Sequence, residues 1–439
     1  MNVDRHDNSI LRCGVLVIGA GVAGLNCALH LPRGESVFVV SKGGLKSSDS
    51  FLAQGGICVL RDGGDFDGYF EDTMRAGHYE NDADAVRCMI ENSRATINEL
   101  ISFGVRFRRE KDGSLAYTRE GAHSRPRIVF HADCTGKEIT SHLLKEARLR
   151  ENIRFFADTT MLDLIADDNN AVCLGAVLRD NRTGEIYPVK ANAVVLATGG
   201  VGGLYRHSTN FRILTGDGLA VCMRHGVALQ NADYVQHHPT TLYSEKRGRR
   251  FLISESVRGE GATLVDKNGK RFVDELLPRD VVTAVIRRKM EEEGTKFVRL
   301  DLRTCVGGAS AVGRHFPSIV ARCRKEGYDV FREPIPVVPA QHYYMGGIKS
   351  DLSGRTSMKR LYAVGETCCN GVHGKNRLAS NSLLESLIFA KRAAEDITKL
   401  SEIRDEGLPA IDYGQFLPLR TYSENHKKMV REVVRGEKQ

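Results

Sequence analysis

Gly14-Val-Leu-Val-Ile18, followed at once by Gly19-Ala-Gly-Val-Ala-Gly24, is the stretch that decides the fold. The apolar run is typical of a buried parallel strand, and helical spacing follows it over residues 25–31. Ser36-Val-Phe-Val-Val40 is a second apolar strand that completes a βαβ unit. The glycines of such a unit make the tight turn, admit a pyrophosphate and let helix and strand pack closely. The residues predicted to bind a dinucleotide here are Gly19, Ala20, Gly21, Val22, Ala23 and Gly24.

The two residues after the second strand depart from the usual dinucleotide site. That strand normally ends in Asp or Glu, which takes the ribose hydroxyls, but Ser41 and Lys42 stand here. Because a serine can hydrogen-bond a ribose and a lysine can reach a phosphate, we expect an altered site rather than a lost one.

Two later strands indicate which dinucleotide is bound. Ala193-Val-Val-Leu-Ala-Thr-Gly-Gly200 ends in Thr-Gly-Gly, and Leu361-Tyr-Ala-Val-Gly-Glu366 ends in a glycine and an acid. Both endings resemble strands of two-dinucleotide flavoproteins, in which the late acid meets the ribityl-phosphate region of the flavin. The resemblance implies FAD rather than NAD as the cofactor.

Composition excludes several other classes of protein. The 439 residues carry 63 Lys and Arg against 55 Asp and Glu, a formal charge of +8 that is spread along the chain, so no nucleic-acid partner is expected. No apolar run approaches the ~18 residues of a membrane span, and the polar start of the chain lacks a secretion signal. The 11 cysteines include no CxxC pair, which favours a reducing cytoplasm and argues against a metal site.

Between the strands lie five motifs that a structural core does not explain. Two arginines and two histidines among them supply groups that bind carboxylates, since Arg does so bidentately and His can donate or hold a proton near neutral pH. A small dicarboxylate beside a flavin needs such a set, together with a positioned Arg, His or Glu for the departing proton. The motifs are Gln236–Thr240, Ser254–Ala262, Pro278–Asp280, His342–Gly347 and Asn376–Leu383.

At these motifs the chain resembles the succinate dehydrogenase/fumarate reductase flavoprotein superfamily, over residues ~12–400. The implied fold is α/β: a Rossmann-like, two-dinucleotide-binding FAD domain with an inserted α+β capping domain and a short, truncated C-terminal helical tail. The implied boundaries are 1–232 and 344–400 for the two parts of the FAD domain, 233–343 for the capping domain and 401–439 for the tail. The matching stretches are Val39–Gly43, Ala53–Gly56, Thr118–Ser124, His131–Gly136, Gly216–Gly218, Gln236–Thr240, Arg258–Ala262, Leu277–Asp280, His342–Gly347 and Gly374–Leu384.

Three details of the resemblance point to the branch of the superfamily that oxidises L-aspartate. Members that bind FAD covalently carry a histidine four residues before Ala-Gln-Gly-Gly, but Asp49 stands there, so FAD should be non-covalent. Glu120 occupies a position where the branch places a carboxylate against the substrate ammonium and succinate dehydrogenases have glutamine. Ser41 and Lys42 in place of the ribose acid are also typical of this branch. Alternatively, Glu120 is a loop residue that pairs with Arg119 or Arg125.

The resemblance assigns roles residue by residue. His238, His342 and Arg377 hold the two carboxylates of the substrate, Arg279 is the proton donor or acceptor, and Glu120 reads the amino group. The other substrate-binding residues are Thr240, Ser254 and Glu255. The further FAD-binding residues are Ser41, Lys42, Asp49, Ser50, Phe51, Gln54, Gly55, Gly56, Asp217, Glu366, Ser382 and Leu383.

The implied activity is oxidation of L-aspartate to iminoaspartate, with FAD reoxidised by oxygen or fumarate, as the first step of NAD biosynthesis. A quinolinate-forming enzyme would take over the unstable imine, and fumarate and succinate would also bind. Two alternatives remain open: a fumarate-reducing or succinate-oxidising relative, and a flavin-binding structural or regulatory protein without turnover.

The C-terminal region is shorter than the helical bundle that family members usually carry. Residues 401–439 leave room for one helix, which we expect to start with Ser423 as its N-cap and to end at Gly436. Because no predicted site residue lies there, activity should not depend on this region.

Overall fold

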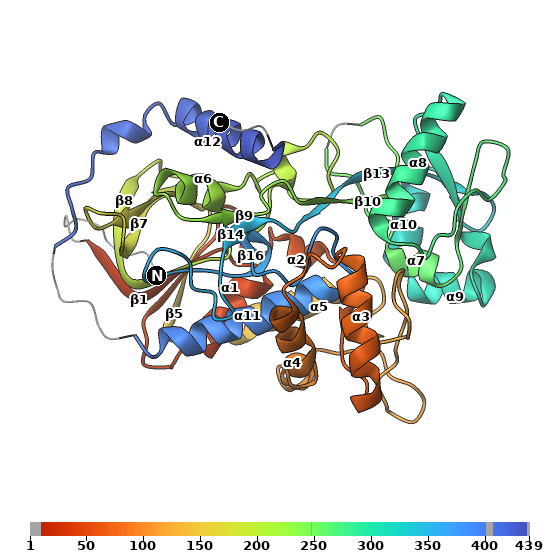
Figure 1. The fold of residues 1–439 in the computed structure, drawn as a ribbon, viewed down its shortest axis with the longest axis horizontal. Helices are drawn as coiled ribbons and strands as arrows, with labels where there is room; N and C mark the ends of the chain where they lie inside the picture. Colours follow the sequence, from red (N-terminus) through yellow and green to blue (C-terminus); the bar gives the residue numbers. More distant parts are fainter. Residues whose placement is uncertain (1–9, 247, 401–406, 437–439) are drawn as a thin grey trace.

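The computed structural model describes residues 10–246, 248–400 and 407–436. Its largest sheet has seven strands in the order β5-β2-β1-β8-β7-β6, with β15 paired to β8 off that path (Figure 1). The strands are β1 (Leu11–Ile18), β2 (Val37–Val40), β5 (Ile153–Phe156), β6 (Thr159–Ala166), β7 (Cys173–Asp180), β8 (Ile186–Leu196) and β15 (Leu361–Ala363). The chain is thus an α/β protein, as expected.

The predicted βαβ unit is present. β1 and β2 are parallel, with Val15 opposite Val37, and α1 (Val22–His30) connects them. β8 and β15 continue the parallel arrangement on the other side of β1 and contain the predicted strands at 193–196 and 361–363. The carboxyl ends of these four strands therefore meet at one edge of the sheet, where α/β folds bind ligands.

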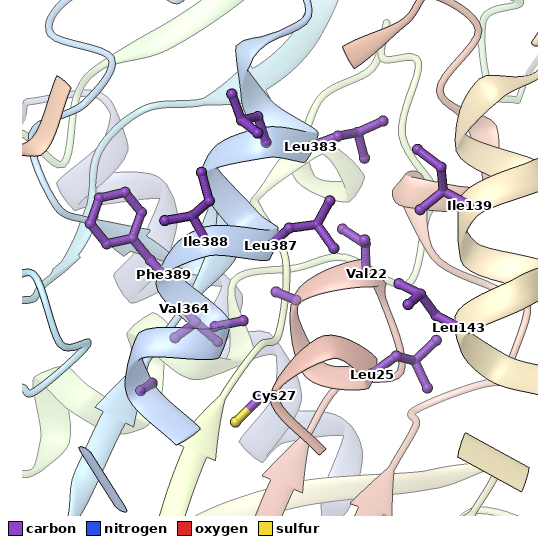
Figure 2. Packing of buried hydrophobic residues seen from close by; sticks show 14 of the residues in the cluster. Val22, Leu25, Cys27, Ile139, Leu143, Val364, Leu383, Leu387, Ile388 and Phe389 are labelled. Carbon is purple, nitrogen blue, oxygen red and sulfur yellow. The ribbon is translucent and has the colours of Figure 1, made fainter. Parts of the chain in front are cut away.

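One face of this sheet is covered by three helices that share a hydrophobic core. α1 lies between α5 (Thr135–Arg148) and α11 (Asn381–Ile397), and α4 (Ala83–Ser102) packs against α11. Figure 2 shows the contact: side chains of α1, α5 and α11 point toward one another around Val22, Leu143 and Leu387. Because α11 comes from the far end of the chain, this core joins the two stretches of sequence that were assigned to the FAD domain.

A separate four-stranded antiparallel sheet, in the order β10-β13-β12-β11, lies at the other end of the molecule (Figure 1). It has a hydrophobic core of its own, built around residues such as Leu264, Ile286 and Val337. Its strands are β10 (Val235–Leu242), β11 (Thr263–Val265), β12 (Val298–Asp301) and β13 (Ile335–Tyr344). The helices beside it are α7 (Glu255–Gly259), α8 (Arg279–Glu293), α9 (Gly308–His315) and α10 (Pro317–Lys325).

The remaining elements are short or lie at the periphery. The small sheets consist of β9 (Leu229–Gln230), β14 (Gly347–Lys349) and β16 (Cys368–Cys369), and of β3 (Ile57–Cys58) with β4 (Ile128–Val129). The other α-helices are α2 (Asp49–Leu52), α3 (Phe66–Ala76), α6 (Asp217–Arg224) and α12 (Leu419–Val434). The 3-10 turns are η1 (Gly63–Asp65), η2 (Gly202–Leu204), η3 (Leu302–Thr304), η4 (Gly365–Thr367) and η5 (Tyr413–Phe416).

The C-terminal helix starts earlier than the sequence predicts. α12 begins at Leu419 after Pro418, so Ser423 lies inside the helix and is not its N-cap. Packing explains the extra turn, because Leu419 and Tyr422 join a cluster around the buried Phe416. The far end agrees with the prediction, since the helix stops at Val434 and Gly436 has a left-handed φ of 70°. Residues 401–406 and 437–439 of the predicted tail lie outside the described residues.

No described helix combines the length and the apolar character that crossing a membrane would require.

Candidate FAD and dicarboxylate site

One large cavity lies where the carboxyl ends of the parallel strands face the four-stranded sheet. It measures about 1680 Å³, including the part that opens to solvent. Most of the predicted site residues line it, namely Gly19, Ala20, Gly21, Val22, Ala23, Ser41, Lys42, Asp49, Ser50, Gln54, Gly55, Gly56, Glu120, Asp217, His238, Ser254, Glu255, Arg279, His342, Glu366, Arg377, Ser382 and Leu383. The fold thus brings the predicted cofactor and substrate residues to a single space.

Three predicted residues do not line the cavity. Gly24 packs α1 onto β1, since a Cβ there would lie 2.0 Å from the carbonyl oxygen of Gly19. Thr240 is buried behind the wall, where its hydroxyl donates to the backbone oxygen of Ile253 at 3.0 Å. Phe51 lies in α2 beside the residues that do face the cavity. Gly24 therefore acts through packing, while the backbone of Thr240 contacts Nδ1 of His238 from behind the wall.

The turn between β1 and α1 forms a cradle of backbone groups at one end of the cavity. Gly19 has a φ of 125°, and a Cβ there would lie 2.0 Å from the carbonyl oxygen of Ala197. The helix starts at Gly21 without a side-chain cap, and the Val22 N–H meets the Ser50 hydroxyl at 3.1 Å. The N–H groups that stay open at this helix N-terminus suit the pyrophosphate of FAD, with the Ser50 hydroxyl beside them.

Lys42, close to this cradle, contacts other side chains of the protein. Its ammonium forms an ion pair with Asp217 at 2.7 Å and donates to the Thr215 hydroxyl at 3.0 Å. The Thr215 hydroxyl in turn donates to Asp217 at 2.6 Å. Lys42 therefore fixes the start of α6 at the cavity wall, as well as placing a positive charge there.

Two carboxyl groups in the cofactor part of the cavity have no ion pair in the described residues. Asp49 accepts the Phe211 N–H at 2.8 Å through Oδ1, and its buried Oδ2 has no hydrogen-bond partner in the described residues. Glu366 accepts the Tyr344 N–H at 3.0 Å. Burial raises the pKa of both groups, and the mutual repulsion adds to the effect on Glu366. An orphaned polar atom of this kind is consistent with a ligand that completes the site.

At the opposite end of the cavity two arginines converge. Arg279, the first residue of α8, donates through Nη1 to the amide oxygen of Gln236 at 2.9 Å, and Arg377 Nε reaches the same oxygen at 3.3 Å. Arg377 also lies over the ring of Tyr343, with 4.5 Å from Cζ to the centroid. Burial first, and then the charge of Arg279, lowers the pKa of Arg377 to about 10. Two like charges held this close favour an anionic ligand.

Glu255 balances part of this positive charge. Its Oε2 accepts from Nε of Arg279 and lies 3.4 Å from Arg258 Nη2. Burial alone would raise the pKa of Glu255, but Arg279 and Arg258 outweigh it and hold the pKa below its usual range. Glu255 is therefore an ionised carboxylate in direct contact with the arginine predicted to move the proton.

The two histidines face each other at this end. The rings of His238 and His342 are 5.1 Å apart and nearly perpendicular. Burial, followed by the charge of Arg279, lowers the pKa of both well below the usual value. Both imidazoles are therefore neutral near pH 7, and each carries one N–H and one bare nitrogen.

Glu120 lies between the cradle and the arginines. Its two oxygens accept from the hydroxyls of Ser256 and Ser380, each at 2.6 Å. Burial first, and then Glu255, raises its pKa. The alternative pairing is not found: in the described chain Arg119 donates to the His123 carbonyl, and Arg125 lies near Asp62 and Asp65.

The sequence analysis assigned no role to several residues of this site. Gln236 bridges the two arginines, while Thr209, Arg249, Tyr343 and Ser380 line the cavity. Gln236 stands in a motif that was singled out, and only its role was missing. Nothing in the local sequence marks Thr209 or Arg249, because each reaches the cavity through the fold of a loop.

Comparison with known proteins identifies the family. The FAD binding domain family matches residues 14–383. An L-aspartate oxidase of Clostridium perfringens is 48% identical over 384 residues, covering 87% of this chain and 86% of the relative. One from Clostridium acetobutylicum is 46% identical over 388 residues, covering 88% of each chain.

Solved structures agree with that result. An Escherichia coli quinol fumarate reductase FrdA variant superposes with a TM-score of 0.83 at 31% identity, covering 97% of this chain and 75% of that chain. Mycobacterium smegmatis Sdh1 gives a TM-score of 0.76 at 31% identity, covering 95% and 72%. The chain belongs to the L-aspartate oxidase family, within the FAD-binding flavoproteins of the succinate dehydrogenase and fumarate reductase type.

Proposed function

We propose that this protein oxidises L-aspartate to iminoaspartate with a non-covalently bound FAD. The observation that carries the proposal is the grouping of Arg279, Arg377, His238 and His342 with one carboxyl group, Glu120, at the end of the FAD cavity. Two carboxylates of a substrate need cations or N–H donors, and an ammonium needs an acceptor. L-Aspartate presents both kinds of group, whereas succinate and fumarate present only carboxylates.

Each residue has a role that follows from its contacts. Arg377 and the two neutral histidines bind and orient the carboxylates, with Ser254 lining the same wall. Glu120, held by Ser256 and Ser380, accepts from the substrate ammonium. When bound, FAD takes up the two electrons of the oxidation and returns them to oxygen or fumarate.

The proton is handled by Arg279 and Glu255. Oxidation of an amine to an imine removes a hydride, which the bound flavin would accept, and one proton, which needs a protein group. Arg279 is the proton donor or acceptor at the cavity wall, and the ionised Glu255 in contact with its Nε can exchange a proton behind it. Both side chains are buried, which keeps bulk water away from the charged cluster.

We further propose that residues 1–232 and 344–400 form the FAD domain, 233–343 the capping domain and 401–439 the tail. The separate core of the four-stranded sheet supports this division.

A cytoplasmic location suits the 11 cysteines, which are all unpaired. An unstable imine product would be passed on to a quinolinate-forming enzyme.

An anaerobic half-reaction tests the activity. Mixing the holoenzyme with L-aspartate should bleach the flavin absorbance, and oxygen or fumarate should restore it. Bleaching by succinate but not by aspartate would favour a succinate-oxidising enzyme, and bleaching by neither would indicate a protein without turnover.

The attachment of FAD is tested separately. Asp49 cannot form the histidyl link of covalent members, so acid precipitation should leave the yellow cofactor in the supernatant. Flavin that stays with the fully denatured pellet would contradict non-covalent binding.

A further inference from the structure

The segment Ser208–Phe211 runs beside β13 and contacts Gln341 and His342 at three points. The Thr209 N–H donates to the carbonyl of Gln341 at 3.0 Å, and the Asn210 side chain donates to the carbonyl of His342 at 3.1 Å. The third contact is to the ring, because the Thr209 hydroxyl lies 2.7 Å from Nδ1 of His342. Both the backbone and the imidazole of His342 are thus fixed by one short stretch of chain.

Thr209 is itself held in place from the side of the four-stranded sheet. Arg249 donates through Nη1 to the Thr209 carbonyl at 3.3 Å, and its guanidinium lies 5.9 Å from the centroid of the Phe211 ring. The contacts of Arg249 therefore hold the segment that carries the Thr209 hydroxyl in place.

The hydrogen bonds around Thr209 indicate whether its hydroxyl or Nδ1 of His342 is the donor in this contact. A neutral imidazole has one N–H donor and one bare nitrogen acceptor. Within the described residues the Thr209 hydroxyl has no other acceptor, which favours the arrangement in which it donates to Nδ1. Nδ1 is then the bare nitrogen, and Nε2 carries the proton and is left for a ligand in the cavity.

That orientation matters because a carboxylate can only accept. An Nε2–H would donate to it, whereas a bare Nε2 would set one lone pair against another. We propose that Thr209 is a positioning residue that fixes His342 as its Nε2–H tautomer, so that the ring donates to a substrate carboxylate. The inference rests on the proposed function only in naming the carboxylate as part of a dicarboxylate substrate.

Three variants of the holoenzyme test this. Thr209→Val keeps the shape and removes the hydroxyl, Thr209→Ser keeps the hydroxyl, and Thr241→Val is the matched control. Thr241 is also buried, and its hydroxyl donates to Val338 on β13, but it does not line the cavity. The primary measurement is the dissociation constant of fumarate, read from the flavin absorbance shift.

We expect Thr209→Val to weaken fumarate at least about tenfold, the effect of losing one hydrogen bond to a charged group. Thr209→Ser and Thr241→Val should stay within about threefold of the wild type, and all three should retain FAD. With L-aspartate, KM should rise more than kcat falls in Thr209→Val. A fumarate affinity at the wild-type level in Thr209→Val would overturn the proposal, as would an equal loss in Thr209→Ser.

The inference stays testable if Thr209→Val does not fold or if the proposed activity is wrong. A ¹⁵N spectrum of histidine-labelled wild-type protein, assigned by comparison with His342→Gln, should show an unprotonated Nδ1. A protonated Nδ1 would overturn the proposal. Absence of flavin bleaching by L-aspartate would refute the activity alone, because the fumarate measurements need no turnover.

Discussion

The two ends of the cavity are built in opposite ways. The cradle at Gly19–Val22 is made of backbone from one contiguous stretch of chain around the start of α1. The far end gathers charged and polar side chains from separate segments, including Gln236, Glu255, Arg279 and Arg377. Backbone groups need only an unobstructed approach, whereas buried charges need partners that offset the cost of leaving water.

The contrast predicts different sensitivities. Adding an atom to the cradle should weaken FAD binding. Removing a charge from the far end should weaken substrate binding. Variants at each end therefore separate loss of cofactor from loss of substrate recognition.

The largest effect is expected for Gly19→Ala. A Cβ at a φ of 125° is strained, and it would lie 2.0 Å from the carbonyl oxygen of Ala197, which a backbone cannot easily vacate. FAD affinity should fall at least about a hundredfold, equivalent to roughly 2.8 kcal/mol. Titration of the apoprotein with FAD measures this, with Gly34→Ala as control because nothing lies within 4 Å of a Cβ there. Normal FAD affinity in Gly19→Ala would refute the backbone cradle.

Arg377→Leu should be next in size. Loss of a charge-assisted contact of roughly 1.5–3 kcal/mol lowers kcat/KM for aspartate by about one to two orders of magnitude. FAD should remain bound, since the cradle is untouched. Steady-state assays and the flavin content of the purified variant check both points, with the exposed Arg314→Leu as control. Wild-type efficiency would remove Arg377 from the substrate site, and loss of FAD would show that the two ends are not independent.

Glu120→Gln tests, at the far end of the cavity, whether aspartate is distinguished from fumarate and succinate by one charge. The amide keeps the size and removes the negative charge; one of the two serine hydroxyls must then accept from the amide NH2 instead of donating. Aspartate should bind about 10- to 100-fold more weakly, a loss of roughly 1.4–2.8 kcal/mol, while fumarate and succinate bind as well as before or better. Dissociation constants for the three ligands decide the matter. Equal losses for all three would indicate a disturbed loop and would end the proposed role in reading the ammonium.

The smallest effect concerns pH. Burial, followed by the charge of Glu255, raises the pKa of Glu120, so this carboxyl takes up its proton at a higher pH than an ordinary glutamate. As pH falls through that raised pKa, aspartate should lose affinity relative to fumarate and approach the weaker binding of Glu120→Gln. The ratio of the two dissociation constants should be independent of pH in the variant. If this ratio were also independent of pH in the wild type, protonation of Glu120 would not control aspartate binding.

The sequence was most informative for features that depend on residues close together in the chain. The close backbone approaches at Gly19 and Gly24 agree with the predicted turn and packing, because these depend on neighbours within a few positions. The start of α12 was predicted wrongly, since contacts of Leu419 and Tyr422 with a distant cluster decide it. Thr240 was assigned to the substrate site, and it lies behind the cavity wall instead.

By itself, the sequence determined the βαβ unit, and through the family resemblance it indicated FAD and named the charged groups proposed to bind a dicarboxylate. Only the tertiary structure decided how those groups meet. Gln236 bridges to Arg377 across 141 positions of sequence, Thr209 reaches His342 across 133, and Ser380 reaches Glu120 across 260. The physical reason is distance along the chain: adjacent residues set backbone geometry, whereas the partners of a buried polar side chain come within hydrogen-bond distance only in the folded chain.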